Sequence, residues 1–115
     1  VVLERTFDIE KAQKIVYDED LNVQLADSGY AFHINSKGVN KGTGFLEALK
    51  MLDANLDDCV AIGDSETDIP LFEIIKNSIA VSNSTEKLKE LAKIVTKKES
   101  GEGVLEGLDI ISSEL

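Results

Sequence analysis

Asp64 and Asp68 stand close together at a point where the hydrophobic pattern of the chain changes its period. They follow the apolar run 59–62, which predicts a buried strand, and they flank the start of segment 69–75, whose apolar residues recur at helical spacing. Ligands of open parallel sheets bind outside the carboxyl ends of the strands, so both carboxylates would lie where such a fold does its chemistry. Two hard oxygen donors there predict a divalent cation, most simply Mg²⁺.

A purely structural role for these acids competes with the metal role. Asp64 could begin a turn, and Asp68 could cap the helix that follows it. Capping does not explain why the turn holds Asp64, Glu66 and Asp68 together. Three like charges in so short a segment repel one another unless a cation lies among them. We therefore carry the metal role forward as the leading interpretation.

Lys41 and Asn83 are the other polar residues that could reach the same edge of the sheet. Lys41 opens a predicted helix, where the helix dipole disfavours a cation, and this indicates an anionic partner such as a phosphoryl group. The alternative is a solvated lysine, because Lys37 lies in the same loop. Asn83 follows the predicted strand 78–81, although an asparagine in a turn is the commoner explanation.

Two further candidates have structural explanations. His33 lies on a short predicted strand and is the single histidine of the chain, so we expect it to be structural or to line a substrate site. Asp18 and Asp20 follow an apolar pair at alternate positions, as a nucleophile and an acid leaving a strand would. That apolar pair, 15–16, continues the spacing of a helix, so the catalytic interpretation of these aspartates remains the weaker alternative.

The pattern of predicted elements changes near residue 38. Segment 1–38 predicts a helix that Asp8 caps and that ends near Tyr17, followed by a hairpin of strands 22–26 and 30–34. From 39 to 115 helices and strands alternate, which implies right-handed crossovers and a parallel sheet with helices on both faces. In this part the predicted strands are 59–62, 78–81 and 94–95, and the predicted helices are 41–52, 69–75, 85–92 and 104–111. We predict an α/β fold, a three-layer Rossmann-like parallel sheet preceded by a small α+β unit.

Composition limits the classes of partner. The 115 residues include 22 acidic and 12 basic side chains, and the formal net charge of −10 argues against binding to nucleic acid or to an anionic membrane surface. The single cysteine, Cys59, cannot form an internal disulfide, which fits a reducing cytoplasm. No signal peptide pattern and no membrane-spanning apolar run are recognisable, so we expect a cytoplasmic location. The first residue is not methionine, and the chain could be a piece of a longer protein.

Several segments together resemble a known family. They are Asn40-Lys41-Gly42, the run 60–68 with its Gly-Asp-Ser turn, segment 79–83, and Ile94-Val95-Thr96 with 101–104. This combination resembles the carboxyl-terminal half of haloacid-dehalogenase-superfamily phosphatases that carry a cap inserted before the phosphate-binding lysine. Segment 28–34, followed by the Lys41 segment, is most similar to the archaeal phosphoglycolate phosphatases.

The resemblance implies Mg²⁺-dependent hydrolysis of a phosphate monoester, a small phosphorylated metabolite, through an aspartyl-phosphate intermediate. Asp64 resembles the metal-ligating acid, and Asp68 the companion acid that ligates the metal or orients its waters. Lys41 resembles the lysine that holds and neutralises the phosphoryl group, and Asn83 a residue close to the phosphate. Thr67 stands where this subgroup usually has asparagine, so the polar contacts of that side chain are not carried over.

The nucleophile of the resembled family is missing from the sequence. In that family the nucleophilic aspartate and the general acid lie on a first strand followed by Gly-Thr, and no such segment is present. We expect residues 1–38 to be the end of the cap and 39–115 the second half of the catalytic core. The other half would come from the same polypeptide or from another chain, and this chain alone would be inactive.

Other functions and assemblies remain alternatives at this stage. A sugar-phosphate phosphatase of the same superfamily and a non-catalytic binding or structural module that keeps the fold are both open. An incomplete sheet would expose an edge that pairs with another chain, so a homo-oligomer is also an expectation.

Overall fold

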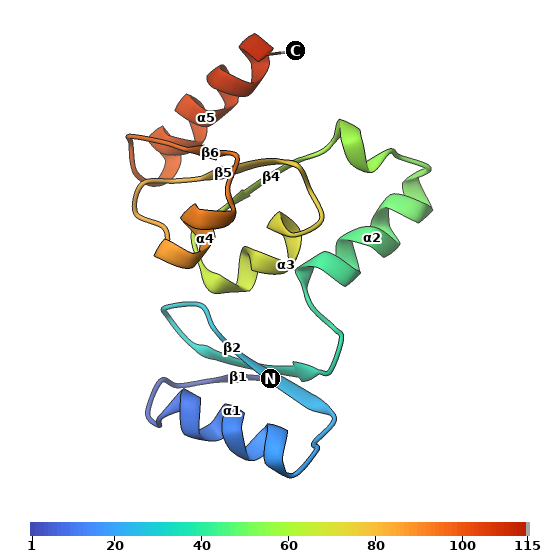
Figure 1. Cartoon of the computed structure of the whole chain (residues 1–115), viewed down its shortest axis with the longest axis vertical. Coiled ribbons are helices and arrows are strands. Elements are labelled where there is room, and N and C mark those ends of the chain that lie inside the picture. The colour runs from blue at the N-terminus through green and yellow to red at the C-terminus, as the bar shows by residue number, and fades with distance from the viewer. Residues whose placement is uncertain (115) are drawn as a thin grey trace.

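The computed structural model describes residues 1–114, which form two three-stranded sheets (Figure 1). The first sheet is antiparallel with strand order β1-β3-β2, and the second is parallel with strand order β4-β5-β6. The strands are β1 Val2–Leu3, β2 Val23–Asp27, β3 Phe32–Ser36, β4 Val60–Gly63, β5 Asn77–Ala80 and β6 Ile94–Val95. The predicted change of pattern near residue 38 therefore coincides with the connection between two sheets, while the assignment of these parts as cap and core stays a prediction.

Helix α1 (Ile9–Asp18) lies beside the first sheet and begins as predicted. The carboxylate of Asp8 accepts hydrogen bonds from the backbone N–H groups of Glu10 and Lys11, which satisfies donors that would otherwise be unpaired at the helix start. The Gln13 side chain donates to the carbonyl of Leu25 on β2 at 3.1 Å. These contacts fix the helix against the edge strand of the sheet.

The hairpin formed by β2 and β3 begins and ends later than predicted. Its turn takes up residues 28–31, because the backbone N–H of Ser28 donates to the carbonyl of Ala31 and the two residues also exchange bonds through the Ser28 hydroxyl. Gly29 has φ +85°, a left-handed conformation in which glycine avoids the strain of a side chain. Tyr30, predicted to start the second strand, is instead a turn residue and is 90% exposed.

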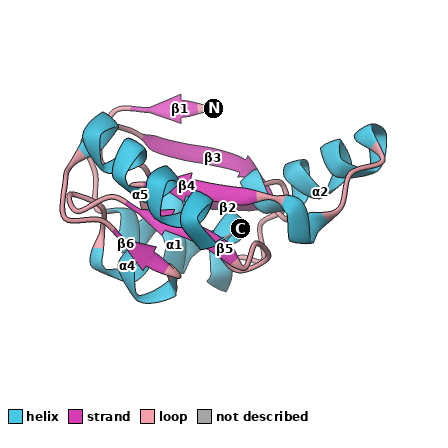
Figure 2. Ribbon diagram, turned by 90° about the horizontal axis from the view of Figure 1, so that it is seen from above, coloured by secondary structure: helices cyan, strands magenta, loops and turns pink. Residues whose placement is uncertain are grey.

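Four helices accompany the parallel sheet: α2 Lys41–Leu52, α3 Ile69–Phe72, α4 Glu86–Leu91 and α5 Ser100–Glu114. Short 3-10 turns, η1 (Leu56–Asp58) and η2 (Glu66–Asp68), flank β4. Figure 2 shows α2 projecting beyond the sheets at one end of the molecule. The helical spacing of Phe45, Leu46, Leu49 and Leu52 predicts one packed apolar face for this helix. Its last turn exposes Met51 and Leu52, so this prediction is wrong for Leu52.

Strand β5 carries the centre of the core and is covered on both faces. Ala80 packs in a buried cluster with Phe72 and Leu88 of α3 and α4. Ile79, its neighbour, contacts α5, where a Cβ on Gly107 would come within 2.5 Å of the Ile79 Cγ2 atom. Successive residues of a strand point to opposite faces, so helices cover both sides of the sheet. The predicted α/β architecture with helices on both faces is confirmed.

Helix α5 begins at Ser100, earlier than the predicted 104–111, and so includes Gly101 and Gly103. The loop before it is fixed by Glu106, whose carboxylate accepts the backbone N–H groups of Lys97 and Lys98. These backbone hydrogen bonds lower the pKa of Glu106 below its ordinary value because they favour the charged carboxylate. Over residues 1–114, none of the helices combines the length and apolar character that a membrane span needs.

We expect Gly103→Ala to destabilise the chain by about 1–3 kcal/mol, the usual cost of overpacking a filled site. A Cβ at Gly103 would lie 2.4 Å from the Lys98 carbonyl oxygen and 2.8 Å from the Thr96 hydroxyl. The matched control is Gly101→Ala in the same helix, where a Cβ meets nothing within 4 Å. Urea unfolding followed by circular dichroism measures both free energies, and equal stabilities for the two variants would contradict this packing.

Candidate active site

The acidic turn is folded around the side chain of Asp68. After β4 ends at Gly63, the Asp68 Oδ2 atom accepts the backbone N–H groups of Asp64 at 3.0 Å and Ser65 at 3.2 Å. Asp68 thus caps its own 3-10 turn, and it makes no side-chain cap bond to α3. The structural alternative predicted for Asp68, capping of the following helix, is therefore wrong. Gly63 is required here, because a Cβ would lie 2.6 Å from the Asp68 Cβ.

Lys41 is joined to this turn by an ion pair. Its Nζ donates to the Asp68 Oδ1 atom at 2.5 Å, across 27 residues of sequence, and the Asp68 side chain is only 7% exposed. Lys41 begins α2, where Asn40 and Thr43 form a reciprocal capping box that fixes the helix start. At Gly42 a Cβ would meet the Pro70 carbonyl oxygen at 2.5 Å, so this glycine permits the close approach of α2 to the turn. The Lys41 side chain is 53% exposed and so keeps contact with solvent, but it belongs to α2 rather than to a loop and is paired with Asp68.

Two of the three acidic side chains of the turn form ion pairs with lysines of the same chain. Lys41 pairs with Asp68, and Lys87 pairs with Glu66 at 3.2 Å. Asp64 is exposed, and its carboxylate makes no hydrogen bond or ion pair within the described residues. The argument that repulsion requires an added cation therefore applies to Asp64 alone.

This donor set fits part of the coordination sphere of Mg²⁺. The Asp64 carboxylate is available as a direct ligand, whereas both Asp68 oxygens already accept hydrogen bonds. Within residues 1–114 no group of three acidic, histidine or cysteine side chains is placed to hold a metal ion. Because Mg²⁺ keeps several waters and takes few protein carboxylates, one exposed aspartate with a second acid beside it suits this ion, provided that further ligands come from elsewhere.

Asn83 lies at the same edge but is bound to α5. Its Oδ1 accepts the backbone N–H of Ser100 at 3.0 Å, and its Nδ2 donates to the Ser100 hydroxyl at 3.4 Å. A hollow of about 400 Å³ is lined by Lys41, Asp64, Asp68 and Ser100. Asn83 is not among its lining residues and is connected to it through Ser100. Ser100 is a site residue that sequence reasoning missed, because its position depends on this long-range contact with Asn83.

A second cleft opens between the hairpin and the acidic turn. Its volume is about 560 Å³, and the hairpin contributes Gln24, Ser28, His33 and Asn35 to its lining. The opposite wall holds Lys41, Asp64 and Glu66. The structure therefore brings His33, predicted to be structural or substrate-lining, to the cleft that contains the lysine and the acidic turn.

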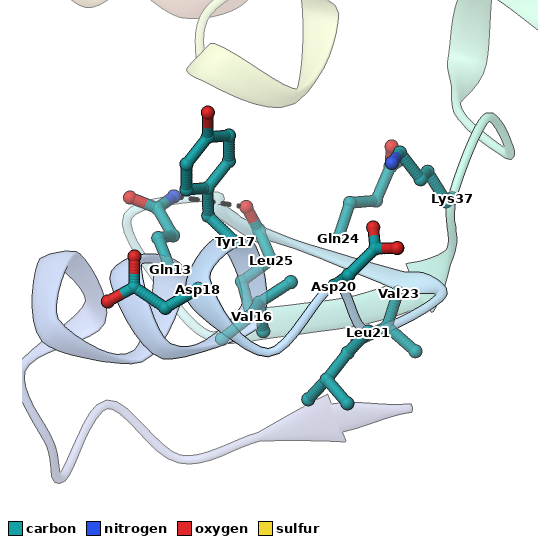
Figure 3. Close-up of a pocket in the computed structure, with 10 residues that line it drawn as sticks. All are labelled: Gln13, Val16, Tyr17, Asp18, Asp20, Leu21, Val23, Gln24, Leu25 and Lys37. Carbon is teal, nitrogen blue, oxygen red and sulfur yellow. Dashed lines mark hydrogen bonds between the residues drawn. The ribbon is translucent and has the colours of Figure 1, made fainter.

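Another hollow, of about 730 Å³, lies between α1 and β2 (Figure 3). It is lined by Asp18 and Asp20, but by neither Lys41 nor the aspartates of the turn. Asp18 is the last residue of α1 and pairs with Lys14 one turn earlier. The pair of acids leaving a strand, considered as an alternative catalytic centre, is not formed.

The fold and this site define an α/β protein with a lysine and an acidic turn at the carboxyl end of one parallel strand. A family described as haloacid dehalogenase-like hydrolase matches residues 2–108. The chain belongs to this family, and the resemblance seen in the sequence is confirmed.

Several relatives of the chain are named phosphoglycolate phosphatase, and two of them illustrate the similarity. The protein from Nitrosopumilus maritimus (strain SCM1) is 49% identical over 109 residues, which cover 95% of this chain and 47% of that protein. The protein from Methanosarcina acetivorans is 38% identical over 113 residues, which cover 98% of this chain and 50% of that protein. The chain thus spans about half the length of the curated relatives it matches.

Solved structures support the fold. The Thermoplasma acidophilum 0175 protein has a TM-score of 0.73 at 23% identity, covering 93% of this chain and 46% of that one. A sugar phosphatase of haloacid dehalogenase subclass IIB, BT4131, has a TM-score of 0.78 at 21% identity, covering 90% of this chain and 40% of that one. At these identities the likeness is one of fold.

We expect Asp68→Ala to destabilise the chain by about 1–3 kcal/mol, since the change leaves the Asp64 and Ser65 N–H groups without their acceptor. The control is Glu66→Ala, which removes an acid of the same turn whose partner Lys87 is exposed, and it should cost at most about 1 kcal/mol. Urea unfolding measures both variants. A cost for Glu66→Ala as large as that for Asp68→Ala would contradict the clamping role of Asp68.

Proposed function

We propose that the chain is part of a Mg²⁺-dependent phosphate monoester hydrolase, most similar to phosphoglycolate phosphatase. It supplies Lys41 and the acids Asp64 and Asp68, and the nucleophilic aspartate comes from residues outside this sequence. The observation that carries the proposal is the pairing of Lys41 with the acidic turn at the end of β4, in a chain whose relatives are named phosphoglycolate phosphatases.

The residues of the chain divide the work of binding a phosphoryl group. The Lys41 ammonium donates hydrogen bonds to non-bridging oxygens and neutralises their charge, and Asp68 holds it in position. Asp64 offers its carboxylate to the metal, with Asp68 as the companion acid. When bound, Mg²⁺ adds positive charge beside the phosphoryl oxygens and stabilises the charge that develops there. Asn83 acts near the phosphate by fixing Ser100 at the rim of the hollow.

The remaining parts of the proposal concern organisation. Residues 1–38 are the end of the cap and 39–115 the second half of the core. The other half of the enzyme lies in the same polypeptide or in a second chain, and the ligand is a small phosphorylated metabolite. Nucleic acid and membrane partners are not proposed, given the net charge of −10. A cytoplasmic location stays a prediction.

A sugar-phosphate phosphatase and a non-catalytic module that keeps this fold are the alternatives. Both share the lysine and the acidic turn, so the site itself does not distinguish them. Comparing the activity of the completed protein on phosphoglycolate and on sugar phosphates distinguishes the proposed phosphoglycolate phosphatase from a sugar-phosphate phosphatase. Absence of any phosphatase activity would favour the non-catalytic module.

The purified 115-residue chain alone should not hydrolyse phosphate monoesters, even with Mg²⁺, because we propose that the nucleophilic aspartate lies outside this sequence. Phosphate release from phosphoglycolate, measured over background hydrolysis, checks this. Turnover that is lost in the Asp18→Ala variant would overturn the expectation and restore the pair Asp18 and Asp20 as a catalytic centre.

Completion of the chain should create activity. In a chimera, this chain replaces its matched segment in the Nitrosopumilus maritimus phosphoglycolate phosphatase, and we expect Mg²⁺-dependent hydrolysis of phosphoglycolate. Lys41→Ala and Asp64→Ala should each lower kcat about 100-fold or more, as loss of a group that stabilises transition-state charge does.

The matched control for this experiment is Lys37→Ala, an exposed lysine in the loop that leads to Lys41. It should leave kcat within a factor of about two, because exposed charges away from a site contribute little. If Lys37→Ala and Lys41→Ala lower kcat equally, or if the folded chimera is inactive with every substrate, the proposed function fails.

A further inference from the structure

One face of the hairpin looks toward the acidic turn. In the register of β2 and β3, Gln24 pairs with Asn35 and Ala26 pairs with His33, and all four residues line the cleft that contains Lys41. Alternation along β3 sends the neighbouring Phe32 to the opposite face, where it is buried against Phe7. The cleft face of the hairpin is therefore largely polar, whereas its other face is apolar.

Two polar side chains on this face, Gln24 and Ser28, are already engaged within the chain. The Gln24 carboxamide donates to the Val39 carbonyl at 2.7 Å and accepts the N–H of Gly38. The Ser28 hydroxyl donates to the Ala31 carbonyl and accepts the Ala31 N–H. These side chains hold the turn and the loop before Lys41, and they have little hydrogen-bonding capacity left for a ligand.

His33 is different, because one of its ring nitrogens is free. Its Nε2 lies 3.1 Å from the Ser28 hydroxyl, which is also hydrogen-bonded to the Ala31 carbonyl. The Nδ1 atom has no hydrogen-bond partner within residues 1–114. Ser28 thus holds one nitrogen of the ring, and the other nitrogen is available to a ligand. A protonated imidazole would donate a charged hydrogen bond to such a ligand.

His33 lies on the wall of the cleft that faces Lys41, where we propose that the phosphate binds. Among the described hairpin residues that line the cleft, only His33 can become positively charged. The nearby Asp27 is already held by Arg5 at 2.9 Å, and the facing wall carries Asp64, the paired Glu66 and Lys41. When the His33 ring is protonated, a ligand with two anionic ends meets Lys41 on one wall and His33 on the other.

We propose that His33 binds the carboxylate of a short phosphorylated hydroxy acid whose phosphate lies at Lys41. This inference rests on the proposed function and refines it, because it assigns to His33 the recognition of the carboxylate end of the substrate. A carboxylate beside His33 favours the protonated ring and gains a charge-assisted hydrogen bond. A neutral sugar phosphate would gain no such contact.

The first test compares two substrates in the chimera described above. Phosphoglycolate carries a carboxylate where 2-hydroxyethyl phosphate carries an alcohol of nearly the same length. His33→Gln should lower kcat/KM for phosphoglycolate about ten-fold or more, mainly through KM, since a hydrogen bond to a charged group is lost. For 2-hydroxyethyl phosphate the change should stay within about three-fold, because the alcohol forms no ion pair with His33.

The control variant is Ser36→Ala, at the exposed end of β3 and outside the cleft lining, which should leave both substrates unchanged. Equal losses for both substrates in His33→Gln would show a structural role and overturn the inference. A chimera that hydrolyses 2-hydroxyethyl phosphate but is insensitive to His33→Gln with phosphoglycolate would overturn the inference while leaving the proposed function intact.

A binding measurement on the 115-residue chain tests the inference without catalysis. In NMR titrations with Mg²⁺ present, phosphoglycolate should shift the signals of the His33 ring and of Lys41, and inorganic phosphate should shift only those of Lys41. If phosphoglycolate leaves the His33 ring unshifted, the inference fails. If His33 responds and Lys41 does not, the phosphate site of the proposed function fails, and with it the orientation proposed here.

Discussion

The buried carboxylate of Asp68 is the interaction on which the site depends. One of its oxygens closes the acidic turn through two backbone N–H groups, and the other holds Lys41 from a helix that begins 27 residues earlier. A buried charge is costly unless it is paired and hydrogen-bonded, and here every contact it makes also fixes a site residue. Gly42 and Gly63 follow from the same constraint, because a side chain at either position would displace α2 or Asp68.

The acids of the turn differ in whether a lysine of the chain pairs with them. Asp68 and Glu66 are compensated by Lys41 and Lys87, so they stabilise the turn in the isolated chain. Asp64 remains exposed and uncompensated at the carboxyl end of β4. One free carboxylate beside one shared lysine supports the proposal that a metal ion and a phosphate ester bind together at this site.

The two sheets meet across a cleft whose walls have different tasks. The Gln24 side chain forms hydrogen bonds with Gly38 and Val39, in the loop directly before Lys41. These bonds fix the position of the hairpin relative to the start of α2. Within the described residues β4 pairs with β5 on one side only, which leaves its other edge open. An open edge is expected for a chain that spans about half the length of its relatives. Pairing of this edge with a second copy of the chain stays a prediction.

The sequence alone determined the α/β alternation, the strand that leads into the acidic turn and the resemblance to a phosphatase family, because these follow from local period and short motifs. Asp64, Asp68 and Lys41 were found as site candidates for the same reason. Only the tertiary structure decided that Asp68 clamps rather than caps a helix, that Lys87 compensates Glu66, and that Ser100 and His33 line the hollows around Lys41. The roles of Lys87, Ser100 and His33 depend on contacts between residues far apart in the chain, which no local pattern encodes. The Asp68 bonds to the Asp64 and Ser65 N–H groups are local, but residue types and spacing do not say which backbone groups a carboxylate in a turn accepts. The exposed end of α2 was mispredicted because helical spacing shows which residues share a face but not whether another element covers it.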